Sequence, residues 1–111
     1  MVFTKILIND SMITKPYYAV IFTSTLNDNT EGYHEMAIKM EALAKQQPGF
    51  IEMVSARNEI GITISYWETE QAILNWKVNL DHLQAQKMGK EVWYASYKVE
   101  IAKVERAFKS R

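Results

Sequence analysis

The sequence lacks several features on which common binding sites depend. None of its 111 residues is cysteine, which excludes disulfides, thiolate nucleophiles and cysteine-based metal sites. Its four glycines stand singly, so the GxGxxG and GxxxxGK loops that hold nucleotide phosphates do not occur. His34 and His82 lie far apart, with no carboxylate-rich run beside either. We therefore expect neither a metal site nor a Rossmann or P-loop nucleotide site.

Net charge and long apolar runs are also missing. Thirteen basic residues balance thirteen acidic ones, so no long-range field would attract nucleic acid or an anionic membrane. No apolar run approaches the roughly 18 residues that span a bilayer. The apolar stretch within residues 1–10 is too short for a secretory signal. We expect a cytoplasmic protein that binds neither nucleic acid nor membranes.

The composition is that of one globular domain. A hydrophobic content of 48% and a charged content of 23% provide one core for a chain of this length. Residues 1–15 are expected to form an N-terminal arm or an extra edge strand, and residues 16–111 the domain. Pro16 restricts Lys15 to an extended conformation, which suits entry into the first main strand.

The first strand and helix follow from hydrophobic periodicity. Residues 17–26 are aromatic, β-branched or small, as in a strand that is covered on both faces. Polar residues 27–30 are expected to cap a helix over residues 31–47, which Pro48 and Gly49 end. One apolar stripe runs along this helix through Tyr33, Met36, Ala37, Met40, Leu43 and Ala44.

An antiparallel hairpin and a second helix come next. Residues 50–57 and 60–67 alternate with a period of two, which predicts two paired strands. Thr69 is expected to cap the second helix, which carries its own apolar stripe. The stripe consists of Ala72, Ile73, Trp76, Leu80 and Leu83. Asp81, followed three residues later by Gln84, predicts a kink near residues 79–81.

The C-terminal part is predicted to contain one more strand. Gly89 should end the helical region, and residues 92–103 should form the strand. The apolar phase then changes to Val104 and Phe108, which predicts a bulge or bend. The tail beyond it is expected to lie against another surface, for which a second subunit is the natural candidate.

This order of elements predicts an α+β, ferredoxin-like split βαβ sandwich. Its antiparallel sheet would carry both helices on one face. The uncovered face would expose too much apolar surface for a monomer, so we expect back-to-back homodimerisation.

Glu52 is the one charged residue on an apolar strand face. Phe50, Val54 and Ala56 are predicted to share that face. The carboxylate should therefore pair with a basic side chain, or else stay protonated. The candidate partners are Arg57, Lys98 and Arg106.

The aromatic spacing resembles that of a known family. It comprises Tyr66-Trp67, Trp76, His82, Ala85-Gln86, Gly89 and Trp93-Tyr94, with residues 47–50 and 104–106. Over residues 17–108 the sequence is similar to the antibiotic biosynthesis monooxygenase-like proteins. The resemblance implies a small dimeric α+β barrel, although members of that family differ in their reactions.

An aromatic pocket with few ionisable groups favours a reaction in which the substrate itself supplies most of the reactivity. The resemblance implies a monooxygenase, needing no cofactor, in which a small phenol or quinol loses a proton and its anion reduces dioxygen. His82 is the predicted general base, because its pKa of about 6.5 suits proton transfer at neutral pH, and a surface or capping role is the alternative. The predicted pocket residues are Trp76, Tyr66, Trp67, Phe22, Tyr94 and Gln86. For Trp76, packing in the core is the alternative, and for Trp67 it is a place at the rim of the sheet or in a dimer contact.

Two further functions stay open at this point. The family that the sequence resembles includes haem-degrading proteins. These have an asparagine on the first strand, a tryptophan on a helix and, ten residues after the tryptophan, a histidine that binds the haem iron. Trp76 matches that tryptophan, but Gln86 stands ten residues on, and residues 17–26 contain no asparagine. The other alternative is a dimer that binds a small aromatic molecule without catalysis, or one whose own side chains fill the cavity.

Overall fold

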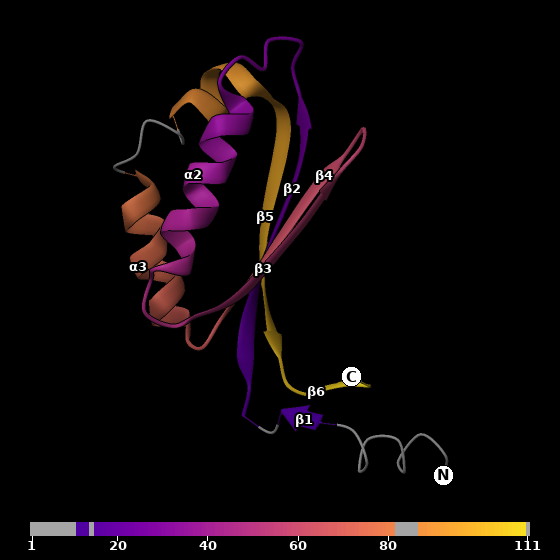
Figure 1. Ribbon diagram of the computed structural model, residues 1–111, viewed down its shortest axis with the longest axis vertical. Coiled ribbons are helices and arrows are strands. Elements are labelled where there is room, and N and C mark those ends of the chain that lie inside the picture. Colours follow the sequence, from indigo (N-terminus) through magenta and orange to yellow (C-terminus); the bar gives the residue numbers. More distant parts are fainter. Residues whose placement is uncertain (1–10, 14, 82–86, 111) are drawn as a thin grey trace.

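Two antiparallel sheets and a helical layer build the described part of the chain, residues 11–13, 15–81 and 87–110 of a computed structural model (Figure 1). The elements are β1 (Ser11–Ile13), β2 (Tyr17–Leu26), α2 (Tyr33–Lys45), β3 (Phe50–Arg57), β4 (Gly61–Trp67), α3 (Glu70–Asp81), a π-helical turn (Gly89–Trp93), β5 (Tyr94–Val104) and β6 (Ala107–Lys109). From β2 to β5 this order confirms the predicted ferredoxin-like α+β fold.

The main sheet has the strand order β3-β4-β2-β5, and every neighbouring pair is antiparallel. The predicted hairpin is confirmed as β3 and β4, with Val54 opposite Ile64. Both α2 and α3 lie over one face of this sheet, which we call the helix face, and the opposite side is the outer face (Figure 1). None of the helices that the structure describes is long and apolar enough to cross a membrane.

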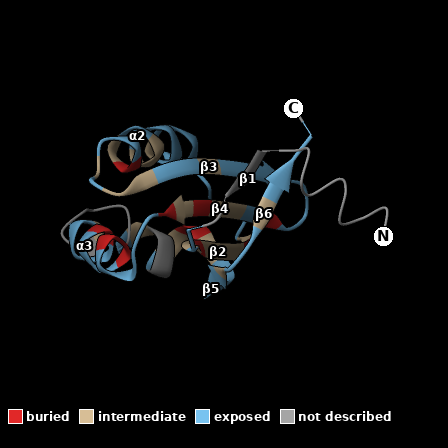
Figure 2. Ribbon diagram, turned by 90° about the horizontal axis from the view of Figure 1, so that it is seen from below, coloured by how far each residue is buried: buried red, intermediate tan, exposed pale blue. Residues whose placement is uncertain are grey.

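The core lies where α3 meets the helix face (Figure 2). Trp67 is fully buried and stacks on Trp76 with ring centroids 6.0 Å apart. The predicted apolar stripe of α3 is confirmed as far as Leu80, and the Thr69 hydroxyl caps the helix by accepting a hydrogen bond from the Ala72 N–H at 3.0 Å. Trp67 therefore belongs to the core of the domain and not to its rim.

A bulge in β3 changes which side chains share a face. The register shifts between Phe50 and Glu52, which leaves Ile51 as the extra residue. Phe50 therefore packs edge-on against Trp67 on the helix face, with centroids 5.4 Å apart, whereas Glu52 is exposed on the outer face. The expectation that Phe50 shares a face with Glu52 is wrong. So is an ion pair of Glu52 with Arg57, which lies on the helix face.

The start of α2 also differs from the expectation. Gly32 occupies the N-cap position with a φ of 82°, and no side chain caps the helix. Asn27 instead holds the π-helical turn: its N–H donates to the Trp93 carbonyl at 2.7 Å, and its amide donates to the Val92 carbonyl at 2.9 Å. Asn27 thus binds the turn before β5 instead of capping the helix.

The helical region before β5 is longer than predicted. Residues 87–88 are helical and the π-helical turn continues from Gly89 to Trp93, so Gly89 does not end the helix and β5 begins at Tyr94. Because α3 continues to Asp81, the chain is helical through residues 79–81. His82, Leu83 and Gln86 lie outside the described residues.

The predicted bend after β5 is confirmed. After Val104 the chain turns into β6, which pairs with β1 so that Phe108 lies opposite Met12. This two-stranded ribbon lies beyond the end of the main sheet (Figure 1). The tail therefore pairs with residues 11–13 of its own chain, and its contact with a second subunit stays a prediction.

Gly49 is the glycine whose replacement should disturb the core most. Its φ of +85° matches the φ of +82° at Gly32, so alanine at either position pays a similar backbone strain. A Cβ on Gly49 would also lie 2.6 Å from the Ala72 Cβ, whereas one on Gly32 has room. We expect Gly49→Ala to lower the free energy of unfolding by about 1–3 kcal/mol more than Gly32→Ala in urea titrations. Equal losses would contradict this packing.

Candidate functional site

Five aromatic rings gather on the helix face near the end of the sheet where β2 ends and β5 begins. We call them the aromatic cluster: Phe22, Tyr33, Trp93, Tyr94 and Tyr97. Centroid distances between neighbouring rings are 5.3–6.0 Å, and several pairs meet edge to face. Such contacts stabilise a cluster beyond the area that it buries.

Strand register and the π-helical turn assemble this cluster. In the β2–β5 pairing, Ser24 lies opposite Tyr97 and Leu26 lies opposite Tyr94. Tyr33 is the first residue of α2, which places its ring over the sheet next to Trp93. The Trp93 indole is buried and donates a hydrogen bond to the Glu31 carbonyl at 2.9 Å. The turn and the helix start are thereby joined.

Arg57, the last residue of β3, brings a positive charge to the cluster. Its guanidinium donates hydrogen bonds to the Ser24 hydroxyl, to the Ser24 carbonyl at 3.5 Å and to the Tyr33 hydroxyl at 3.4 Å. It also lies 5.6 Å from the centroid of the Tyr33 ring, as a cation–π pair. The Arg57 side chain passes over Gly61, where a Cβ would overlap the guanidinium. The glycine therefore makes room for the cation.

The charge of Arg57 has only neutral partners. Within the described part of the chain, the ion pairs are Glu41–Lys45 at 3.5 Å and Lys98–Glu100 at 3.3 Å, and no carboxylate pairs with Arg57. A guanidinium stays protonated at any physiological pH and has five N–H donors in a planar fork. The site can therefore accept an anionic oxygen without first breaking an ion pair.

Tyr94 remains a protonated phenol beside this cation. Burial raises the pKa of its hydroxyl well above the ordinary value, and the neighbouring Tyr33 raises that pKa further. Arg57 lowers it, but by less. The Tyr94 side chain is thus a hydrogen-bond donor, not an anion, at neutral pH.

The structure divides the predicted pocket residues among three places. Phe22 and Tyr94 belong to the aromatic cluster, whereas Trp67 and Trp76 are packed in the core. Tyr66 points to the outer face, where its ring meets Tyr17 edge to face at 5.8 Å. The sheet separates it from the other four.

The predicted base lies where the structure gives no information. His82 and Gln86 fall outside the described residues, so their roles stay predictions. The roles assigned to the other predicted pocket residues as substrate contacts also stay predictions.

The sequence did not predict five members of the site as pocket residues: Ser24, Tyr33, Arg57, Trp93 and Tyr97. Tyr33 fits the apolar stripe of α2, and Arg57 and Ser24 fit ordinary strand alternation. The one sequence feature that indicates their contact is Gly61, which lies opposite Arg57 across the hairpin and opposite Ser24 across the next strand pair. A glycine between them leaves room for a long side chain.

The part of the chain that the structure describes contains no cluster of three or more His, Cys, Asp or Glu residues that could hold a metal ion. His34 is exposed on α2.

The sequence matches no family model, but it is similar to a protein of Bacillus subtilis. YqjZ of Bacillus subtilis (strain 168) is 47% identical over 93 residues, which cover 82% of each chain. The chain belongs to the same protein family as YqjZ. YqjZ itself is described as an uncharacterized protein.

Solved structures show which fold the family has. A variant of SnoaB, a cofactor-independent oxygenase from Streptomyces nogalater, matches with a TM-score of 0.66 at 12% identity over 78% of this chain and 90% of SnoaB. A candidate antibiotic biosynthesis monooxygenase from Nitrosomonas europaea matches at 0.66, with 16% identity over 81% and 90% of the two chains. A conserved protein from Methanosarcina mazei Go1 matches at 0.69, with 10% identity over 80% and 93%. The chain thus has the fold of the antibiotic biosynthesis monooxygenases.

The raised pKa of Tyr94 predicts an alkaline effect on stability. Because the folded pKa exceeds the unfolded value of about 10, the protonated phenol stabilises the fold below that pH, and this contribution is lost as the pH rises through the folded pKa. We expect Tyr94→Phe to flatten the alkaline loss of stability in urea titrations and to remove the last tyrosine to ionise in ultraviolet titrations. Arg57→Gln should raise the Tyr94 pKa further. An unchanged tyrosine titration in both variants would contradict this environment.

Proposed function

We propose that the chain is a monooxygenase that needs no cofactor and oxidises a small phenolic or quinol substrate at the aromatic cluster. The observation that carries the proposal is the Arg57 guanidinium, which is held by neutral groups among aromatic rings. The shared fold with SnoaB, described as a cofactor-independent oxygenase, supports it.

Arg57 would act by holding the substrate as an anion. Charge-assisted hydrogen bonds from the guanidinium favour a phenolate over a phenol, which lowers the pKa of the bound substrate. The exposed side of Tyr97, which stacks on Phe22, would contact its ring, and the protonated Tyr94 hydroxyl would donate a further hydrogen bond. The site would thereby bind and orient the electron-rich form that reacts with dioxygen.

The reaction balances without any redox group in the protein. The phenolate passes one electron to dioxygen, and the resulting phenoxyl radical and superoxide combine to form a carbon–oxygen bond. Protonation of the peroxide and loss of water leave a quinone, so that phenol and dioxygen give quinone and water. His82 is our proposed base: it would take the phenolic proton and return it to the peroxide.

An oxygen-uptake screen with hydroquinones and polyphenols tests this reaction. Arg57→Gln should reduce uptake by about 10- to 100-fold, the effect of losing a charged hydrogen-bond partner. Gly61→Ala should cause a similar loss with the arginine still present, because the added Cβ displaces the guanidinium. His82→Ala should abolish uptake.

Lys77→Gln is the matched control, because Lys77 is exposed on α3 away from the cluster. It should leave the rate unchanged. Full activity in both Arg57→Gln and Gly61→Ala would remove the aromatic cluster from the mechanism. Binding of a phenol that survives His82→Ala, with no oxygen consumed by the native protein, would indicate a binding module instead.

The haem alternative fits the structure poorly. The tryptophan that would match the haem-binding pattern is Trp76, which is 7% exposed and stacked on Trp67. Its ring therefore has little surface left for a macrocycle.

We further propose that the outer face pairs two copies of the chain. Its central positions are apolar: Ala19, Ile21, Val54, Ala56, Ile62 and Ile64. Val54 is 47% exposed and Ile62 is 43% exposed. Exposed apolar neighbours on one sheet face favour burial against a like face.

Substitution on the outer face should separate the copies. Ile62→Glu would place a carboxylate in the dimer interface, and we expect a monomer by light scattering after size-exclusion chromatography. Val78→Glu makes the same kind of change at an exposed residue of α3 and should leave the dimer intact. If Ile62→Glu stays dimeric, this face is not the interface.

A further inference from the structure

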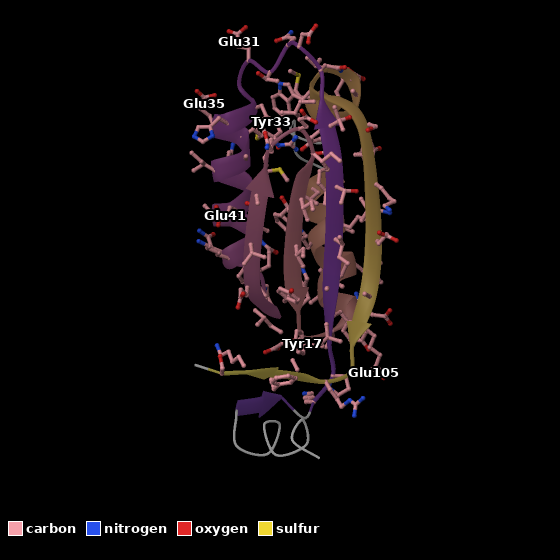
Figure 3. The ribbon with its side chains drawn as sticks, turned by 90° about the vertical axis from the view of Figure 1, so that its right-hand side faces the viewer. Tyr17, Glu31, Tyr33, Glu35, Glu41 and Glu105 are labelled. Carbon is pink, nitrogen blue, oxygen red and sulfur yellow. The ribbon has the colours of Figure 1, made fainter. Side chains whose placement is uncertain are left out.

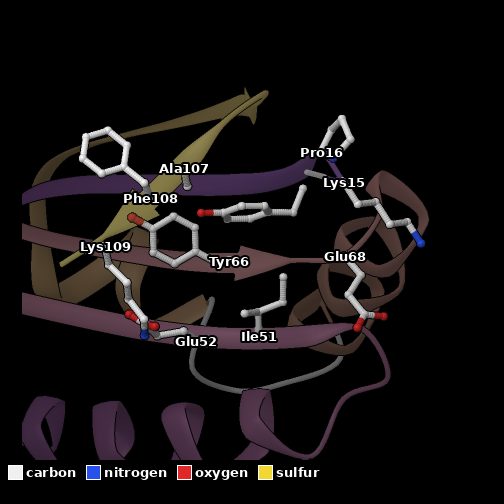
Figure 4. A pocket seen from close by; sticks show the side chains of 10 residues that line it. Lys15, Pro16, Ile51, Glu52, Tyr66, Glu68, Ala107, Phe108 and Lys109 are labelled. Atoms are coloured by element: carbon white, nitrogen blue, oxygen red, sulfur yellow. The ribbon is translucent and has the colours of Figure 1, made fainter. Parts of the chain in front are cut away.

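An open cavity lies on the outer face, away from the aromatic cluster. It has a volume of about 620 Å³ and lies between β6 and the ends of β2, β3 and β4 (Figure 4). The two sites lie toward opposite ends of the sheet, as Tyr33 near one end and Tyr17 near the other show in Figure 3. This volume is in the range of small-molecule sites.

The middle of the cavity is aromatic and apolar. Tyr17 and Tyr66 meet edge to face there, with centroids 5.8 Å apart and ring planes at 61°. Ile51 and Phe108 complete the lining and remain 44% and 41% exposed. The bulge in β3 brings Ile51 to the cavity together with Glu52. These side chains form a surface suited to a flat ring.

Both ends of the cavity carry one acidic and one basic side chain (Figure 4). Lys15 and Glu68 lie at one end, and Glu52 and Lys109 lie at the other. Among the residues that the structure describes, none of these four forms an ion pair. Each end can therefore meet a ligand cation and a ligand anion at once.

We propose that this cavity binds a zwitterionic aromatic molecule of the aromatic amino acid class. The ring would lie against Tyr17 and Tyr66, the ammonium group would bind Glu52 and the carboxylate would bind Lys109. Glu52 lies opposite Tyr66 in the strand register, so the charged end adjoins the aromatic surface. Because Lys109 belongs to β6, the ligand would also join the ribbon to the main sheet.

The balance of charge selects this class over others. A phosphorylated ligand would place its negative charge beside Glu52 and Glu68, where like charges repel it. An uncharged aromatic would leave the acidic and basic groups without partners. Only a ligand with both charges near one ring engages the aromatic middle and one charged end together.

Calorimetry with four probes on the full-length protein tests the proposal. L-Tryptophan carries both charges, tryptamine only the ammonium, indole-3-propionate only the carboxylate and indole neither. We expect L-tryptophan to bind most tightly, each singly charged probe about 10-fold more weakly, and indole more weakly still.

Charge-removing variants assign the contacts. Glu52→Gln should weaken L-tryptophan and tryptamine about 10-fold and spare indole-3-propionate, whereas Lys109→Gln should weaken L-tryptophan and indole-3-propionate and spare tryptamine. Glu59→Gln, in the turn between β3 and β4, is the control and should change nothing. All three positions are exposed, so the variants should keep the fold, which thermal unfolding checks.

Three results would overturn the proposal. The first is no binding of L-tryptophan, as when a second copy fills the cavity, and the second is equal affinity for all four probes. The third is equal L-tryptophan affinity in the native protein and both charge variants. Because none of these variants touches the aromatic cluster and no oxygen is measured, failure here leaves the proposed oxidation standing. Failure of the oxygen-uptake test likewise leaves this cavity unaffected.

Discussion

The stack of Trp67 on Trp76 is the contact on which the rest of the arrangement depends. Trp67 is the last residue of β4, and Trp76 lies on the buried stripe of α3. Their burial against each other therefore fixes α3 on the sheet. With β4 held there, its register places Gly61 beside Ser24 and opposite Arg57. The pairing of β4 with β2 and β3 thus places the Arg57 side chain next to the aromatic cluster.

The two faces of the sheet differ in their chemistry, and the bulge at Ile51 contributes to this. It lets β3 place Phe50 in the core and Glu52 in the outer cavity within three residues. The helix face carries a cation with neutral partners among aromatic rings. The outer face carries an apolar centre and a cavity with charges of both signs. The two ligands that we propose would therefore bind on opposite faces of one sheet.

Much of the fold was predictable because it depends on neighbours in sequence. The β3–β4 hairpin and the buried stripe of α3 follow from periods of two and 3.6 residues. The sequence missed contacts that distant segments make. Asn27 binds the turn at Trp93 instead of capping α2, and the tail after Val104 pairs with β1, which we did not predict. Neither partner is visible from local sequence.

For the site, the sequence by itself determined the chemical class: no thiol, no phosphate loop, and aromatic residues such as Phe22 and Tyr94 in strand positions. Tertiary structure decided which aromatics act together. Strand alternation sends Tyr66 to the opposite face from Trp67, although the two are adjacent in the chain. It also decided that Arg57 meets Ser24, because a contact across three strands depends on register, which tertiary packing sets.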